Sequence, residues 1–208
     1  MRLTELESGA LVIDGVDISS IGLSDLRSSI AVIPQDPVLF QGTVRYNVDP
    51  FDQASDEQIW TVLEESNLKN KVSRDKNGLK MTVEADGDNF SVGEKQLICL
   101  ARALLRKYGF EITKFFFFTL IIFRNKILLL DEATASVDVK TDHLIQNTIQ
   151  TQFRDCTVLT IAHRLNTIIN YDKVLVLDQG ELIQYDAPRV LLNEDGLFKE
   201  MASAAGLI

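Results

Sequence analysis

Short runs of consecutive apolar residues punctuate this chain, and each run has the length of a strand. Strands that are buried on both faces of a parallel sheet have nearly continuous apolar sequences. The runs near residues 30, 128 and 158 fit that pattern best. The segments predicted as strands are 11–15, 29–33, 127–131, 157–162, 173–178 and 181–185.

Apolar residues at helical spacing occupy much of the chain between these runs. Segment 55–68 has Ser55 as a predicted N-cap and an apolar stripe beginning at Ile59. Segment 91–107 begins with Ser91, and Glu94 three residues later indicates a capping box. Further helical segments are predicted at 24–27, 140–153, 188–192 and 194–202.

Strands that alternate with helices predict an α/β fold with a mainly parallel sheet. Residues from about 45 to 107 carry little strand signal, so we expect a helical subdomain inserted into the sheet domain. Within and beside it, residues 34–55 and 74–90 are predicted as loops, because they are rich in proline or in charge and glycine.

Composition narrows the classes of function. The 208 residues fit one domain, and a net charge of −9 argues against a nucleic-acid surface without excluding a bound nucleotide. Cys99 and Cys156 have no metal-ligand spacing, which indicates a reduced, intracellular protein. The polar start is not a signal peptide, and the longest apolar run, 115–123, is too short to span a bilayer.

Two adjacent carboxylates, Asp131 and Glu132, end the strand predicted at 127–131. Open α/β sheets bind ligands at the carboxyl edge of their strands. One acid there can hold Mg²⁺ while the other orients or deprotonates a water molecule. Taken alone, the stretch is equally typical of a strand followed by a solvated turn.

Polar motifs follow other predicted elements in a fixed order along the chain. They are Ile33-Pro34-Gln35-Asp36-Pro37, Phe90-Ser91-Val92-Gly93-Glu94-Lys95-Gln96, Leu130-Asp131-Glu132-Ala133-Thr134-Ala135-Ser136-Val137-Asp138 and Thr160-Ile161-Ala162-His163-Arg164. Together they resemble the nucleotide-binding domain of ABC transporters, most closely the second such domain of the multidrug-resistance-associated C subfamily. The resemblance implies a P-loop NTPase-like fold and covers almost the whole chain apart from residues 108–125.

This resemblance assigns roles around ATP and Mg²⁺. Gln35 matches the Q-loop glutamine, which contacts Mg²⁺ and the attacking water and senses the membrane domains. Asp131 matches the Mg²⁺-binding Walker B aspartate, and Glu132 matches the catalytic glutamate. His163 matches the switch histidine that contacts the γ-phosphate.

Three further matches concern partners. Ser91 and Gly93 match the signature motif, in which a helix N-terminus attracts a γ-phosphate. Asp138 matches the D-loop aspartate at the dimer interface. The resemblance thus implies a second nucleotide-binding domain in a head-to-tail dimer, the transmembrane domains of an exporter, a place on the cytoplasmic face of a membrane, and no nucleic acid.

The sequence departs from the family pattern at the phosphate-binding loop. None of its 11 glycines precedes a lysine, so the motif G-x-x-x-x-G-K-[ST] is missing, and in the family that loop lies just before the segment that begins this chain. We expect an N-terminally truncated cassette with an incompletely covered sheet and poor solubility. Two functions stay open: the intact parent is an ATP-hydrolysing exporter, or this fragment only offers its signature motif to a partner. A DNA-repair-type cassette ATPase is disfavoured by the 33–37 loop.

Two local departures accompany it. Glu94 stands where the family has glutamine, and a carboxylate near a γ-phosphate is electrostatically unfavourable. Residues 108–125 form a Phe-rich insertion between Lys107 and Lys126, with high β propensity. Translated intron or gene-model error is the first hypothesis, and a membrane-touching or interface loop is the second; sequencing the transcript separates them.

Overall fold

The computed structural model describes residues 1–108, 126–132, 137–162 and 164–208. They form two compact units, Met1–Thr160 and Ile161–Ile208, which are described separately. The predicted insertion lies outside the described residues except for Tyr108, which is the last residue of a helix.

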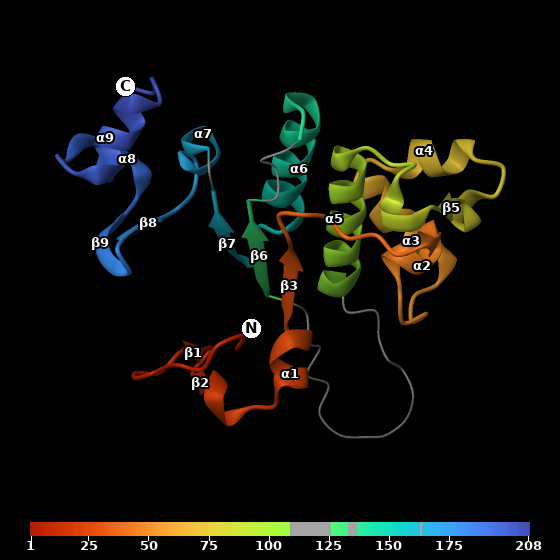
Figure 1. Cartoon of the computed structure of the whole chain (residues 1–208), viewed down its shortest axis with the longest axis horizontal. Helices are drawn as coiled ribbons and strands as arrows, with labels where there is room; N and C mark the ends of the chain where they lie inside the picture. The colour runs from red at the N-terminus through yellow and green to blue at the C-terminus, as the bar shows by residue number, and fades with distance from the viewer. Residues whose placement is uncertain (109–125, 133–136, 163) are drawn as a thin grey trace. The chain divides into compact units, whose positions relative to one another are not determined.

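The first unit contains the central sheet, in the order β3 (Ile30–Ile33), β6 (Ile127–Asp131) and β7 (Thr157–Ile161). β3 and β6 are parallel, with Ile30 opposite Ile127 and Ile33 opposite Leu130. The parallel sheet predicted from the apolar runs is therefore confirmed, and Figure 1 shows the strands side by side.

One face of this sheet is closed by the main core. Alternate residues of β3 and β6 point their side chains into that core, namely Ala31, Ile33, Leu128 and Leu130. It is completed by α5 (Val92–Tyr108) and α6 (Val139–Gln152), and α5 packs directly on β3 (Figure 1).

The opposite face is only partly covered. Ile30 packs with Ile18 and with Leu26 of α1 (Leu23–Ser28). Val32, however, is 37% exposed, and Leu159 of β7 is 57% exposed on the side opposite the core-facing Val158. We call Val32 and Leu159 the open sheet face. The prediction of an incompletely covered sheet is confirmed.

Segment 34–55, predicted as a loop, contains regular structure instead. β4 (Gly42–Thr43) pairs antiparallel with β5 (Thr82–Val83), and α2 (Val44–Val48) follows β4 at once. The helix forms because Thr43 caps it, accepting from Tyr46 N, and because Val44 and Val48 are buried in the core. Burial of these side chains by distant parts of the chain stabilises the helix in a segment whose proline-rich composition favours a loop, and no local sequence pattern predicts that burial.

The helical region continues with α3 (Asp56–Glu65) and α4 (Lys69–Arg74). Ser55 caps α3 as predicted, in a reciprocal capping box with Gln58. The helix ends before the predicted residue 68, since Asn67 adopts a left-handed φ of 61°. Residues 78–80 and 85–87, in the second predicted loop, form short 3-10 turns beside β5.

A small hairpin precedes α1. β1 (Val12–Ile13) and β2 (Val16–Asp17) pair antiparallel around Asp14 and Gly15, whose φ angles are 50° and 82°. Two positive φ angles are typical of a type I′ turn, for which Asp-Gly is a preferred pair. Only the first of these strands was predicted.

The second unit contains α7 (Leu165–Ile168), β8 (Val174–Asp178), β9 (Glu181–Asp186), α8 (Pro188–Asn193) and α9 (Leu197–Ala204). Val174 and Val176 pack with Leu191 and Phe198, whereas Leu175 and Leu177 are exposed. The segment 173–178, predicted as a core strand, is thus one strand of an antiparallel hairpin in which only one face is covered. Antiparallel sheets commonly leave one face exposed to water. None of the helices in the described part of the chain is long and apolar enough to cross a membrane.

Candidate nucleotide site

The parallel register brings three of the predicted site residues to one edge of the sheet. Ile33 lies opposite Leu130, so Gln35 leaves β3 at the edge where Asp131 and Glu132 end β6. Gln35 and Asp131 are exposed there. A carboxylate pair and an amide at the carboxyl ends of adjacent parallel strands form the polar set expected for a metal–phosphate ligand.

Glu132 has an unusual backbone conformation. Its φ is 44°, in the left-handed region that non-glycine residues rarely occupy. Such a conformation costs of order 1–3 kcal/mol and occurs most often at functional sites. The conformation therefore adds a second reason, beyond the adjacent carboxylates, to place chemistry at Glu132.

The loop that carries Gln35 is held by α5. Gln96 Nε2 donates to Pro34 O at 3.1 Å and to Gln35 O at 2.9 Å, and the side chain of Gln96 is 1% exposed. Sequence reasoning missed this residue. Its signal was a glutamine one position before Leu97 and four before Leu100, on a helix face that is otherwise apolar.

A second set of side-chain hydrogen bonds fixes the segment after Gln35. Asn47 is fully buried, accepts from Phe40 N at 2.8 Å and donates to Phe40 O at 2.7 Å. Arg102 of α5 donates to Val38 O at 2.7 Å and to Asn47 Oδ1 at 3.0 Å. Two side chains from different helices thus set the course of residues 38–47, and neither was predicted.

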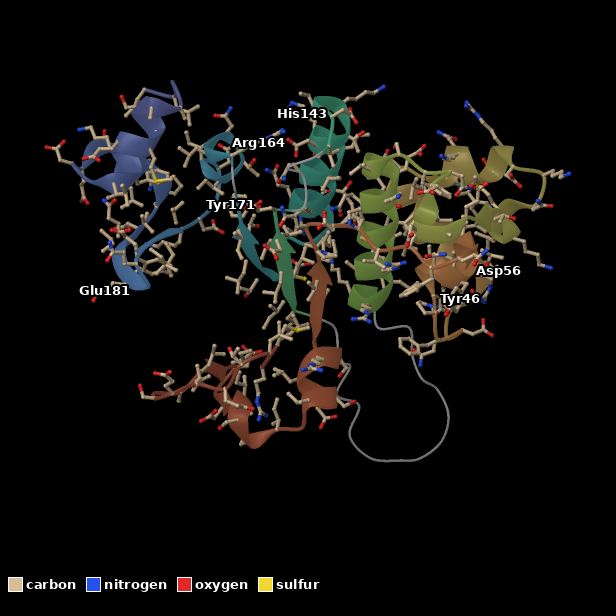
Figure 2. The ribbon with its side chains drawn as sticks, in the orientation of Figure 1. Tyr46, Asp56, His143, Arg164, Tyr171 and Glu181 are labelled. Carbon is tan, nitrogen blue, oxygen red and sulfur yellow. The ribbon has the colours of Figure 1, made fainter. Side chains whose placement is uncertain are left out.

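Residues 38–51 expose apolar side chains, among them Val38, Phe40, Tyr46 and Phe51. The rings of Phe40 and Tyr46 meet edge to face with centroids 6.3 Å apart. Figure 2 shows Tyr46 on α2 and Asp56 at the start of α3. Asp56 accepts from Arg45 Nε at 2.9 Å, which ties α2 to α3.

The predicted capping box at the start of α5 is present. Glu94 Oε2 accepts from Ser91 N at 2.9 Å, and Ser91 Oγ accepts from Glu94 N at 3.2 Å. Gly93 is required by packing within this chain, since a Cβ there would lie 2.9 Å from Thr141 Cγ2 of α6. The N-terminus of α5 therefore packs closely against Thr141 of α6.

Asp138 is the N-cap of α6. Its carboxylate accepts from Thr141 N at 3.0 Å, and hydrogen bonds from Thr141 hold the pKa of Asp138 below its ordinary value. The structure thus gives Asp138 a local role that its match to a D-loop did not include. Since Thr141 also abuts Gly93, this cap lies next to residues 91–93, which carry the match to the signature motif and are called the signature segment below.

His163 lies outside the described residues. Among those that are described, no three His, Cys, Asp or Glu side chains gather as a metal cluster. Mg²⁺ requires no such cluster, because it keeps several waters and binds through one or two carboxylates together with substrate phosphates. The exposed Asp131 carboxylate is a fitting hard-oxygen ligand of that kind.

Comparison with known proteins agrees with this arrangement. A family model described as ABC transporter matches residues 1–135. ATP-binding cassette sub-family C member 3 of Rattus norvegicus is 52% identical over 206 residues, and sub-family C member 2 of Homo sapiens is 50% identical over the same length. Each alignment covers 99% of this chain and 12% of the relative.

The fold has a solved counterpart as well. A structure described as a bacterial Atm1-family ABC exporter with ATP bound matches with a TM-score of 0.81 and 32% sequence identity. The match covers 96% of this chain and 32% of that one. With the family model spanning more than half of its residues, and with the sheet edge and the capped α5 N-terminus in place, this chain belongs to the ABC transporter family.

Proposed function

We propose that this chain is the cassette portion of a membrane exporter in which ATP binding and hydrolysis drive transport. The observation that carries the proposal is the β3–β6 register, which brings Gln35, Asp131 and Glu132 to one sheet edge in a chain of this family. The chain spans about an eighth of the curated relatives it matches, so transport itself belongs to a larger assembly.

Each residue at the sheet edge has a chemical part in this proposal. Asp131 holds Mg²⁺, which when bound supplies positive charge to the phosphates. Glu132 orients the attacking water and accepts its proton. Gln35 contacts the same water from the neighbouring strand, and His163 contacts the γ-phosphate.

The signature segment serves a second cassette. The positive end of the α5 dipole and the amides after Ser91 attract an anion. In a head-to-tail dimer, Ser91 and Gly93 face ATP held by the partner, and Asp138 lies near the same interface. The 17-residue length of α5 and its capping box support this part of the proposal.

The membrane domains contact the segment after Gln35. Phe51 is 71% exposed, and Val38, Phe40 and Tyr46 expose further apolar surface along residues 38–51. Clustered exposed apolar residues mark interaction sites more often than solvated surface. Hydrogen bonds from Arg102 join this segment to α5, the helix that begins beside Ser91, and in this proposal α5 carries the coupling between the membrane domains and the signature motif. The cassette accordingly lies on the cytoplasmic face of the membrane.

A second candidate function is a non-enzymatic one. The 208 residues contain no Gly-Lys pair and hence no G-x-x-x-x-G-K-[ST] motif with its phosphate lysine. In this alternative, the chain lends Ser91 and Gly93 to a partner's ATP and turns over none of its own.

The two candidates separate in a mixed assay. The purified chain is combined with a sub-family C cassette that has a complete phosphate-binding loop, and ATP turnover is measured with Ser91→Ala and Glu132→Gln variants of the chain. Both candidates predict that Ser91→Ala lowers turnover. Only the enzymatic one predicts a loss from Glu132→Gln and micromolar ATP affinity of the chain alone. Turnover unaffected by adding the chain would refute both.

A further inference from the structure

A lysine and a glutamate meet at the N-terminus of α5. Lys71 Nζ of α4 lies 2.6 Å from Glu94 Oε2, and the two side chains are 30% and 31% exposed. The ammonium also lies 4.3 Å from the centroid of the Phe90 ring, a cation–π distance. Lys71 is therefore held at this place by two independent contacts, one to Phe90 just before Ser91 and one to Glu94 in the first turn of the helix.

Glu94 raises an electrostatic problem for the proposed function. As the capping-box acid it stabilises the helix start, yet it places a negative charge where a phosphate has to approach. Ser91 Oγ accepts from Glu94 N and can still donate its own hydrogen to an anion. The Ser91 hydroxyl hydrogen thus stays available although Ser91 N and Glu94 N are engaged in the capping box, and the unfavourable element is the Glu94 charge.

Lys71 neutralises the charge of Glu94. Partial burial raises the pKa of Glu94, but hydrogen bonds from Lys71 and Ser91 outweigh it and hold the pKa below its ordinary value. Glu94 is accordingly ionised, and Lys71 brings the pair to zero net charge. The same contact keeps Oε2 on Ser91 N, which orders the loop ahead of the helix.

We infer that Lys71 is a positioning residue of the signature segment, which neutralises Glu94 so that the α5 N-terminus accepts the terminal phosphates of a nucleotide bound by a partner cassette. The inference rests on the proposed function. It accounts for Glu94 where the family has an uncharged glutamine, since a glutamine there needs no countercharge.

The test uses inorganic phosphate as the probe and the full chain as the protein. Amide NMR shifts of residues 91–94 are followed during phosphate titration of the wild type, Lys71→Met, Glu94→Gln and the double variant. Lys71→Met should weaken phosphate binding about tenfold, as expected for one unshielded charge near the site. The double variant should return to within about twofold of Glu94→Gln, because no charge is then left to neutralise.

The double variant separates charge from structure. If Lys71 acted only as a packing or ion-pair support, removing both partners would leave binding as weak as in Lys71→Met. Lys69→Met is the matched control: it removes the same charge from α4, where Lys69 pairs with Glu64 at 2.8 Å, and should leave phosphate affinity unchanged. Thermal melts confirm that each variant is folded.

The results overturn the inference in two ways: wild-type chain without phosphate-dependent shifts at residues 91–94, or a double variant no better than Lys71→Met. A separate measurement, MgATP-dependent association with a sub-family C cassette that has a complete phosphate-binding loop, addresses the proposed function. Rescue of phosphate binding together with failure to associate would retain the role of Lys71 and refute the dimer.

Discussion

Replacing Arg102 by methionine tests whether α5 holds the segment that follows Gln35. The guanidinium donates to Asn47 O and Asn47 Oδ1, and to Val38 O at 2.7 Å. Methionine keeps the apolar length of the side chain and removes every donor. Two of the three acceptors that it leaves behind belong to Asn47, which is fully buried.

The size of the effect follows from these contacts. A hydrogen bond that involves a charged group contributes about 1.5–3 kcal/mol, and Arg102 makes three to oxygen. Burial lowers the pKa of Arg102, so part of that gain is offset by the cost of enclosing its charge. We expect Arg102→Met to lower the free energy of unfolding by about 3 kcal/mol.

Urea denaturation of the 208-residue chain measures the loss, and hydrogen exchange locates it. The Phe40 amide, which donates to Asn47 Oδ1, should lose protection first. Arg106→Met is the matched control, because Arg106 is an exposed arginine one turn further along the same helix; its variant should stay within about 0.5 kcal/mol of the wild type. Equal urea midpoints for the two variants would refute the stabilising role of the Arg102 hydrogen bonds.

Three further outcomes can be measured on the same chain. Glu132→Gly should raise the free energy of unfolding by about 1 kcal/mol relative to Glu132→Gln. Glycine relieves left-handed strain of about 1–3 kcal/mol, and the greater flexibility of the unfolded chain offsets about 0.5–1 kcal/mol of that gain; a glycine variant that is less stable in urea denaturation would contradict the strain. Leu159→Thr removes an exposed apolar side chain, so it should raise the monomer fraction in light scattering with an unchanged melting temperature. Unaltered aggregation would show that the open sheet face does not cause self-association. Because the pKa of Glu94 is lowered on folding, its contribution is complete above the ordinary glutamate pKa and disappears as pH falls through the folded value, so wild type should lose stability to acid faster than Glu94→Gln; parallel urea midpoints from pH 7 to 3 would exclude this.

Local pattern predicted the elements whose cause is local. The β3 and β6 strands follow from their apolar runs, and the capping box of Ser91 and Glu94 follows from residue spacing alone. Because parallel strands end at one edge, the placement of Gln35 and Asp131 at the same edge was also predictable.

The elements missed by sequence analysis depend on distant contacts. α2 forms because Val44 and Asn47 are buried by other parts of the chain, in a segment whose prolines favour a loop. Gln96 and Arg102 contact residues about 60 positions earlier, which no window along the sequence includes. Lys71 was invisible for the same reason, since its partner lies on another helix.

The pairing of Ile30 with Ile127 has a consequence for how the molecule assembles. β4 to α5 all lie between the two strands, and closing so long a loop costs entropy that only a compact intervening region reduces. We therefore expect the helices to form before β3 pairs with β6, so that the edge carrying Gln35 and Asp131 is assembled late in folding. Since closure entropy grows only with the logarithm of loop length, the additional residues 108–125 raise that cost by merely about 0.2 kcal/mol.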